Sequence, residues 1–155
     1  MVISREIRER IDAEMTRYPH KRGALLTALR LVQDELGHIA PETAAELAEL
    51  FGLRPIDILE VVSFYNLLYD SPQPRHHVTV CTNLPCSLRG ARGLLRQLEA
   101  HLGTRAGEAT ADGRIHLGHE ECLGACGYAP MMRVDDRYHE GLDVDAAKRI
   151  VDALD

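Results

Sequence analysis

The 155-residue sequence contains no run that approaches the roughly 18 uncharged apolar residues needed to span a bilayer. We therefore do not expect an integral membrane protein, although hydrophobic residues make up 45% of the chain. The first residues, MVISREIRERIDAEM, mix arginine with acids, whereas a secretory peptide needs an apolar stretch and a transit peptide avoids acids. The expected location is therefore cytoplasmic.

An excess of positive charge is also missing. The formal net charge is -6, with 8 basic and 12 acidic residues up to Pro72 and 10 basic and 12 acidic residues after it. Nucleic-acid binding draws most of its affinity from neutralised phosphates, so neither half has the composition of a nucleic-acid-binding surface. We expect a protein partner instead.

Motifs for independent catalysis are absent as well. The sequence has no Ser/His/Asp set, no phosphate-cradling glycine loop and no paired-carboxylate motif. We therefore expect no catalytic turnover from the chain alone, and any chemistry should belong to an assembly that contains it.

Residues 1–72 have the apolar spacing of helices and are predicted to form an N-terminal helical bundle. Caps and breakers delimit four helices: Ser4 to Met15, Arg22 to Leu36, Pro41 to Phe51 and Ile56 to Leu68. The last helix is broadly apolar, which favours a place in the middle of the bundle. Residues 44–65 also resemble a helix-turn-helix, but the would-be recognition helix offers no Arg, Lys, Asn or Gln before Asn66.

Two prolines in residues 70–74 indicate a linker. After it, the spacing of apolar residues changes from the helical repeat to the alternation of strands. Residues 73–155 are predicted to form an α/β domain with four strands and two helices, which makes the whole chain α+β. The strands are expected at His77 to Val80, around Ile115 to Leu117, at Met131 to Val134 and after Asp136. The helices are expected at Leu88 to Leu102 and after the capping residue Asp143.

Four cysteines form the principal candidate site of this second domain: Cys81, Cys86, Cys122 and Cys126. In a reducing compartment, two close pairs of thiols are typical of metal or cluster ligands. The spacing is C-x4-C followed by C-x3-C, and both pairs are expected in loops after strands. Structural zinc sites favour C-x2-C, whereas a 2Fe-2S centre needs two thiolates at each iron, which separated pairs provide. A 2Fe-2S cluster is favoured over a zinc-stabilised module, and the absence of C-x-x-C disfavours a thiol-disulfide enzyme.

Several residues near the cysteines are more ambiguous. His116 and His119 are assigned surface or packing roles, since four thiolates already complete a site. Arg89 and Arg92 are expected to open the helix after Cys86, where their charge would stabilise a reduced cluster or simply face solvent. Pro130 follows Cys126 by four residues and precedes a predicted strand, where a cis proline and an ordinary turn proline are the two interpretations.

The stretches VTVCTNLPCSLRGA and GEATADGRIHLGHEECLGACGYAPMMRVDDRYHEGL resemble the 24 kDa 2Fe-2S subunit of respiratory complex I, the NADH-quinone oxidoreductase. The helical half, with YPHKRGALLTALRLVQDELGHIAPE and EVVSFYNLLYD, is similar to the same family. The resemblance implies a helical domain followed by a thioredoxin-like 2Fe-2S ferredoxin domain. It also implies that the four cysteines are the ligands of one cluster.

The resemblance extends to function and partners. It implies an electron-transfer component of a larger redox complex, docked on the flavoprotein subunit that binds FMN and NADH. Its cluster would lie off the main electron path. The expected place is the peripheral arm of the complex, on the cytoplasmic side of a bacterial inner membrane. NAD-reducing hydrogenases and NAD-dependent formate dehydrogenases use similar subunits, so the parent complex stays open.

Overall fold

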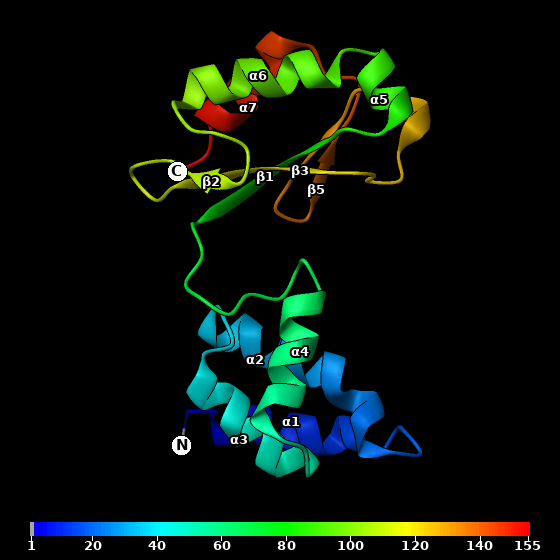
Figure 1. Cartoon of the computed structure of the whole chain (residues 1–155), viewed down its shortest axis with the longest axis vertical. Helices are drawn as coiled ribbons and strands as arrows, with labels where there is room; N and C mark the ends of the chain where they lie inside the picture. The colour runs from blue at the N-terminus through cyan, green and yellow to red at the C-terminus, as the bar shows by residue number, and fades with distance from the viewer. Residues whose placement is uncertain (1) are drawn as a thin grey trace. The chain divides into compact units, whose positions relative to one another are not determined.

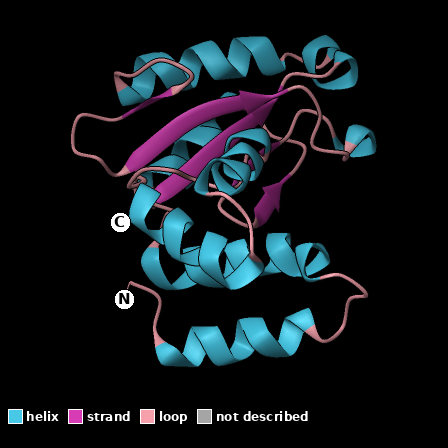
Figure 2. Cartoon of the chain, turned by 60° about the horizontal axis from the view of Figure 1, so that its bottom comes forward, coloured by secondary structure: helices cyan, strands magenta, loops and turns pink. Residues whose placement is uncertain are grey.

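The computed structural model describes residues 2–155, and the chain divides into two compact units that meet between Gln73 and Pro74. Among residues 2–155, every strand belongs to the second unit, and the regular secondary structure of the first unit is helical (Figures 1 and 2). The helices of the first unit are α1 (Arg5–Met15), η1 (Lys21–Ala24), α2 (Leu25–Leu36), α3 (Pro41–Phe51) and α4 (Pro55–Phe64). None of the helices in residues 2–155 is long and apolar enough to cross a membrane.

Local sequence explains where these helices begin and end. The Ile7 N–H donates to the Ser4 hydroxyl at 3.3 Å, which caps α1 as predicted. Gly37 and Gly52 have left-handed backbones with φ of 81° and 66°, and they end α2 and α3 where the glycines were expected to do so. The helix expected from Arg22 begins later, at Leu25, because the preceding turn is a 3₁₀ helix.

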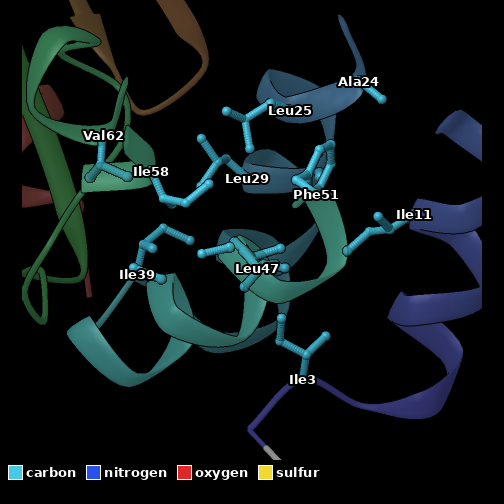
Figure 3. Packing of buried hydrophobic residues seen from close by; sticks show 14 of the residues in the cluster. Ile3, Ile11, Ala24, Leu25, Leu29, Ile39, Leu47, Phe51, Ile58 and Val62 are labelled. Carbon is cyan, nitrogen blue, oxygen red and sulfur yellow. The ribbon is translucent and has the colours of Figure 1, made fainter. Parts of the chain in front are cut away.

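Apolar side chains from the helices form the core of the first unit. Leu29, Leu47 and Ile58 are fully buried and come from α2, α3 and α4, whose side chains meet in Figure 3. Ile11 of α1 is equally buried. Within a helix the buried residues recur at helical spacing, as Ile7, Ile11 and Met15 do in α1, so burial of one face of each helix stabilises the unit.

The prediction that the fourth helix runs to Leu68 in the middle of a bundle is wrong. The helix α4 ends at Phe64, because Tyr65 adopts an extended backbone. Within α4 only Ile58 and Val62 are buried, whereas the side chains of Ile56 and Phe64 are 61% and 76% exposed. A broad apolar pattern therefore reflected two faces, one in the core and one open to solvent.

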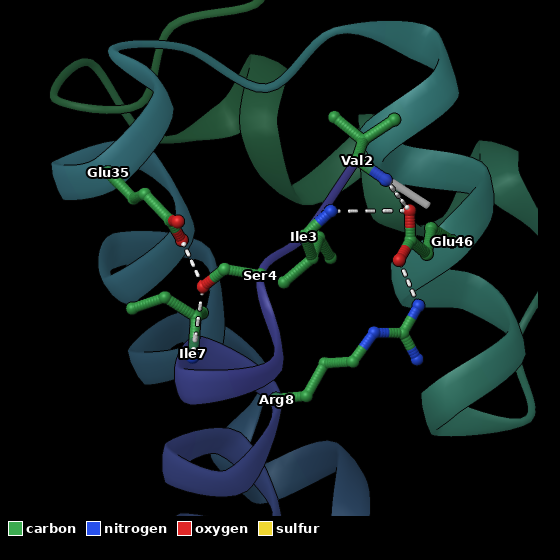
Figure 4. A network of polar contacts seen from close by, with 7 residues as sticks. All are labelled: Val2, Ile3, Ser4, Ile7, Arg8, Glu35 and Glu46. Carbon is green, nitrogen blue, oxygen red and sulfur yellow. Dashed lines mark hydrogen bonds and ion pairs between the residues drawn. The ribbon is translucent and has the colours of Figure 1, made fainter.

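A polar network joins the start of the chain to α2 and α3 (Figure 4). Glu46 of α3 accepts hydrogen bonds from the N–H groups of Val2 and Ile3 and forms an ion pair with Arg8. Burial acts to raise the pKa of Glu46, but these hydrogen bonds and the Arg8 charge outweigh it and lower the pKa. The Ser4 hydroxyl donates to Glu35 of α2 at 3.1 Å.

The second unit is a sheet of five strands in the order β2-β3-β1-β4-β5, with three α-helices. The strands are β1 (His76–Cys81), β2 (Glu108–Ala109), β3 (Ile115–Glu120), β4 (Met132–Val134) and β5 (Arg137–His139). The α-helices are α5 (Leu84–Leu88), α6 (Ala91–Leu102) and α7 (Val144–Asp152), and η2 (Cys126–Tyr128) is a short 3₁₀ helix. The expected four strands and two helices were thus incomplete, because β2 and α5 are too short to show a period.

Strand alternation directs one face of this sheet into a core. β1 runs parallel to β3 and antiparallel to β4, and α6 and α7 contact each other on one side of the sheet (Figure 1). The buried strand residues that share this core with α6 and α7 are Val78, Val80, Ile115, Leu117, Met132 and Val134. The helix expected from Leu88 is divided at Gly90, whose φ of 95° separates α5 from α6.

Candidate metal centre

The first pair of cysteines lies at one end of the sheet and in the short helix that follows it. Cys81 is the last residue of β1, and Cys86 lies within α5. The prediction that this pair lies in a loop is therefore wrong. Asn83 caps α5 by accepting a hydrogen bond from the Leu84 N–H at 2.7 Å. Both thiols are buried, with residue exposures of 2% and 1%.

The second pair follows β3 and is more exposed. Cys122 lies in the turn after the strand and Cys126 begins η2. The turn is held at two points. Tyr138 of β5 donates its hydroxyl to the Leu123 carbonyl at 2.8 Å, and the Gly124 N–H points to the Cys122 sulfur at 3.4 Å.

Strand register brings the two pairs to the same end of the sheet. Because β1 and β3 are parallel, Cys81 lies opposite Glu120, and Cys122 emerges two residues later. Burial, together with the neighbouring thiols of Cys81 and Cys126, raises the pKa of the Cys86 thiol to about 11. Three of the four predicted ligands are thus close enough to influence one titration. Cys122 is not among the main causes of that pKa shift, and it lies in an exposed turn.

Met131 joins this site through both of its backbone groups. Its carbonyl accepts a hydrogen bond from the Cys81 N–H at 3.1 Å, and its own N–H opposes the rise in the pKa of Cys86. The preceding Ala129–Pro130 peptide is cis, so the first of the two interpretations of Pro130 is confirmed. Sequence reasoning did not assign a role to Met131, since a backbone contact leaves no residue pattern.

A second set of polar contacts connects the backbone around the cysteines, and sequence reasoning missed it. The Ser87 hydroxyl donates to the Thr82 carbonyl at 2.8 Å, and the Thr82 hydroxyl donates to the Glu120 carbonyl at 3.0 Å. The Arg92 Nε–H donates to the Ser87 hydroxyl at 3.2 Å. Arg92 therefore faces this network, whereas Arg89 follows the end of α5 and does not open a helix.

The histidines nearest the cysteines in the sequence are residues of the sheet, with His77 in β1 and both His116 and His119 in β3. The His116 ring is 5.3 Å from that of His77, its partner in the β1–β3 register, and His119 is exposed on the wall of a cavity of about 320 Å³. Burial lowers the pKa of His77, and the nearby His116 and Arg133 lower it further, while Asp135 opposes them.

The donor set of this centre suits a binuclear cluster. In residues 2–155, no three side chains of His, Cys, Asp or Glu are gathered as ligands of one metal ion. A 2Fe-2S cluster does not require such a group, because each iron takes two protein thiolates. Soft thiolates are its usual ligands, and backbone N–H groups directed at the sulfurs of Cys122 and Cys86 would offset the added negative charge.

The family described as thioredoxin-like [2Fe-2S] ferredoxin matches residues 11–155 of this sequence. The chain belongs to this family. The resemblance found in the sequence is therefore confirmed, and the α+β architecture of the ferredoxin is consistent with a thioredoxin-like fold.

Relatives of this ferredoxin come from several bacteria. An NADH-quinone oxidoreductase subunit of Rhizobium meliloti is 42% identical over 88% of the chain and 82% of the relative. The corresponding NADH-quinone oxidoreductase subunit of Mycobacterium tuberculosis is 36% identical over 93% of the chain, which spans only 58% of that relative. A solved NAD+-reducing [NiFe]-hydrogenase superposes with a TM-score of 0.73 at 26% identity, covering 83% of the ferredoxin and 22% of the hydrogenase chain.

Proposed function

We propose that this ferredoxin is the electron-transfer component of an NADH-quinone oxidoreductase and carries one 2Fe-2S cluster. The relative from Rhizobium meliloti, which bears that enzyme's name, matches most of both chains at 42% identity. The structural observation that supports the proposal most strongly is that cysteines lie together at one end of the sheet, where Cys81 and Cys126 both raise the pKa of Cys86.

In this proposal Cys81, Cys86, Cys122 and Cys126 are the four ligands. When bound, a 2Fe-2S cluster accepts or releases one electron at a time. The chain's residues supply the binding and the environment. The cysteines must lose their protons to bind iron, and the Met131 and Gly124 N–H groups stabilise the sulfur charge that results.

The proposed partner is the flavoprotein subunit that binds FMN and NADH. Support comes from large apolar side chains left open beside the cysteines. Leu84 and Leu88 of α5 are 69% and 79% exposed, and Tyr128 of η2, a helix that contacts α5, is 65% exposed. Apolar groups exposed together are typical of protein interfaces. The complex would place the chain in a peripheral arm on the cytoplasmic side of a bacterial membrane.

The two compact units are proposed to be separate domains. Residues 1–72 would form a helical bundle, and residues 73–155 would form the thioredoxin-like ferredoxin domain that contains all four cysteines. An NAD-reducing hydrogenase is the second candidate for the parent complex, supported by the TM-score of 0.73. The higher identity to NADH-quinone oxidoreductase components favours the first candidate.

The experiment is anaerobic purification of the full chain, with iron and sulfide analysis and EPR of the dithionite-reduced protein. We expect about two irons and two sulfides per chain and an S = 1/2 signal. NADH should reduce the cluster only when the flavoprotein subunit is added. A colourless chain that binds zinc and cannot be loaded with iron would contradict the proposal, and so would NADH oxidation by the flavin-free chain.

The variant Leu88→Glu tests the docking surface within the same experiment. A charge on this exposed position should slow NADH-dependent reduction through the flavoprotein by about tenfold, because it would be buried in the interface. Reduction by dithionite needs no partner and is the internal control, so it should be unchanged.

A further inference from the structure

Side-chain hydrogen bonds connect three of the four cysteine-bearing segments. Thr82 follows Cys81, Ser87 follows Cys86, and Glu120 precedes Cys122 by two residues. The Ser87 hydroxyl donates to the Thr82 carbonyl at 2.8 Å, which joins the two ends of the segment between Cys81 and Cys86. The Thr82 backbone N–H and hydroxyl both donate to the Glu120 carbonyl, at 2.9 and 3.0 Å, which joins that segment to the end of β3.

The direction of these bonds follows from the chemistry of the groups. Arg92 donates from Nε to the Ser87 oxygen at 3.2 Å, and a guanidinium can only donate. The Ser87 hydroxyl must therefore accept from Arg92, which leaves its single proton for the Thr82 carbonyl. Arg92 sets the orientation of the hydroxyl, and the hydroxyl in turn holds the backbone beside Cys81.

We propose that Arg92 is a positioning residue for the cluster, acting through Ser87 to hold the Cys81 and Cys86 segments in their binding geometry. The inference rests on the proposed function, in which these cysteines bind a 2Fe-2S cluster. Preorganised backbone reduces the conformational entropy lost when the ligands converge on iron. The Arg92 bond is exposed and competes with water, whereas the Ser87 bond is partly buried, so the second should matter more.

Arg96 provides a matched control. It lies one helical turn after Arg92 in α6 and lines the same cavity of about 320 Å³. Among the hydrogen bonds of residues 2–155, none joins Arg96 to Ser87 or Thr82. A substitution at Arg96 therefore makes the same change in charge beside the site without changing the direction of the hydrogen bonds.

Variants at position 92 differ in whether the new side chain can donate a hydrogen bond to the Ser87 hydroxyl or accept one from it. In Arg92→Glu the carboxylate can only accept, so it would take the Ser87 proton away from the Thr82 carbonyl. In Arg92→Lys a donor remains and the orientation should be kept. In Arg92→Ala the hydroxyl loses a partner but can still donate to Thr82, so the effect should be small.

The experiment uses the full chain with its cluster loaded and measures the half-life of the visible absorption in excess EDTA, together with the EPR spectrum after reduction. Arg92→Glu should shorten the half-life about fivefold, as the loss of one hydrogen bond of ordinary strength would do, and broaden the EPR lines. Arg92→Lys should restore both to within about twofold of the unmodified chain. Equal thermal unfolding of the apo chains, followed by circular dichroism, would show that the fold is intact.

Two further variants separate orientation from charge. Arg96→Glu should leave the half-life and the EPR spectrum unchanged, and Arg92→Glu should have no added effect when Ser87 is already alanine. A loaded chain in which Arg92→Glu changes nothing, or in which Arg96→Glu acts equally, would overturn this inference alone. An unmodified chain that holds no cluster would instead overturn the proposed function, and this inference with it.

Discussion

At the scale of residues, the four cysteines are not equivalent in their surroundings. Cys81 and Cys86 are buried beside the core of the second unit, whereas Cys122 and Cys126 are exposed. The buried pair is fixed by the strand and helix that carry it, and the exposed pair depends on a turn held by Tyr138 and Gly124. If all four cysteines are ligands as proposed, a cluster should be lost most readily through Cys122 and Cys126.

Replacing Cys122, one of the two exposed cysteines, tests the proposed ligand assignment. Cys122→Ser removes one of the two thiolates of an iron, and we expect the chain to lose most of its iron and its EPR signal. Iron analysis and EPR of the purified variant measure this directly. Glu121→Ser, which places the same hydroxyl on the adjacent exposed residue, should retain both. Unchanged iron and spectrum in Cys122→Ser would remove Cys122 from the ligand set.

At the scale of elements, α4 depends on a charged cap at its N-terminus. The Arg54 N–H donates to Asp57 at 3.0 Å, and the Arg54 guanidinium donates to the same carboxylate at 2.7 and 3.1 Å. The Arg54 side chain, helped by the Arg54 backbone N–H, therefore lowers the pKa of Asp57 from 3.8 to about 2. Because the folded chain favours the charged form, Asp57 stabilises it fully above pH 3.8, and this contribution is lost as the pH falls toward 2.

The variant Asp57→Asn should therefore be less stable than the unmodified chain at pH 7, with an unfolding midpoint lower by about 2 °C. The difference should shrink between pH 4 and pH 2, where the unmodified chain also loses the charge. Thermal unfolding followed by circular dichroism across this range measures it. Glu60→Gln changes a charge on the same helix without losing a cap, and a loss of equal size there would contradict the assignment to Asp57.

Element prediction succeeded where caps and long periods coincided. α1 and α3 were predicted with correct starts and ends, because Ser4, Pro41 and Gly52 act within the local chain. β2 has two residues and α5 has five, so neither shows a period that distinguishes helix from strand. The exposure of one side of α4 was not predictable either, since an apolar side chain has the same sequence pattern whether it is buried or exposed.

At the scale of the whole molecule, all the groups that make up the candidate metal centre lie in the second unit. The cysteines, Met131 and the Thr82–Ser87–Arg92 network fall between Pro74 and Asp155. That unit also has its own hydrophobic core, distinct from the core of the first unit. A domain with its own core can fold alone.

A fragment of residues 73–155 should therefore bind the cluster without the helical half. We expect about two irons per fragment and the EPR spectrum of the full chain, because no ligand or backbone donor is removed. The fragment of residues 1–72 is the complementary control and should be helical by circular dichroism and free of iron. A 73–155 fragment that is unfolded or cannot be loaded with iron would contradict the division into two domains.

The sequence by itself determined the helices with clear caps, the change from helical to strand period after Pro74, and the family, which short motifs around the four cysteines identified. Only the tertiary structure decided that Cys126 approaches Cys86 and that Thr82 bonds to Glu120. Those contacts join residues far apart in the chain, and they exist because the parallel register of β1 and β3 places Cys81 opposite Glu120. Local sequence fixes local backbone geometry, whereas the meeting of distant segments depends on how the sheet pairs and what its core buries.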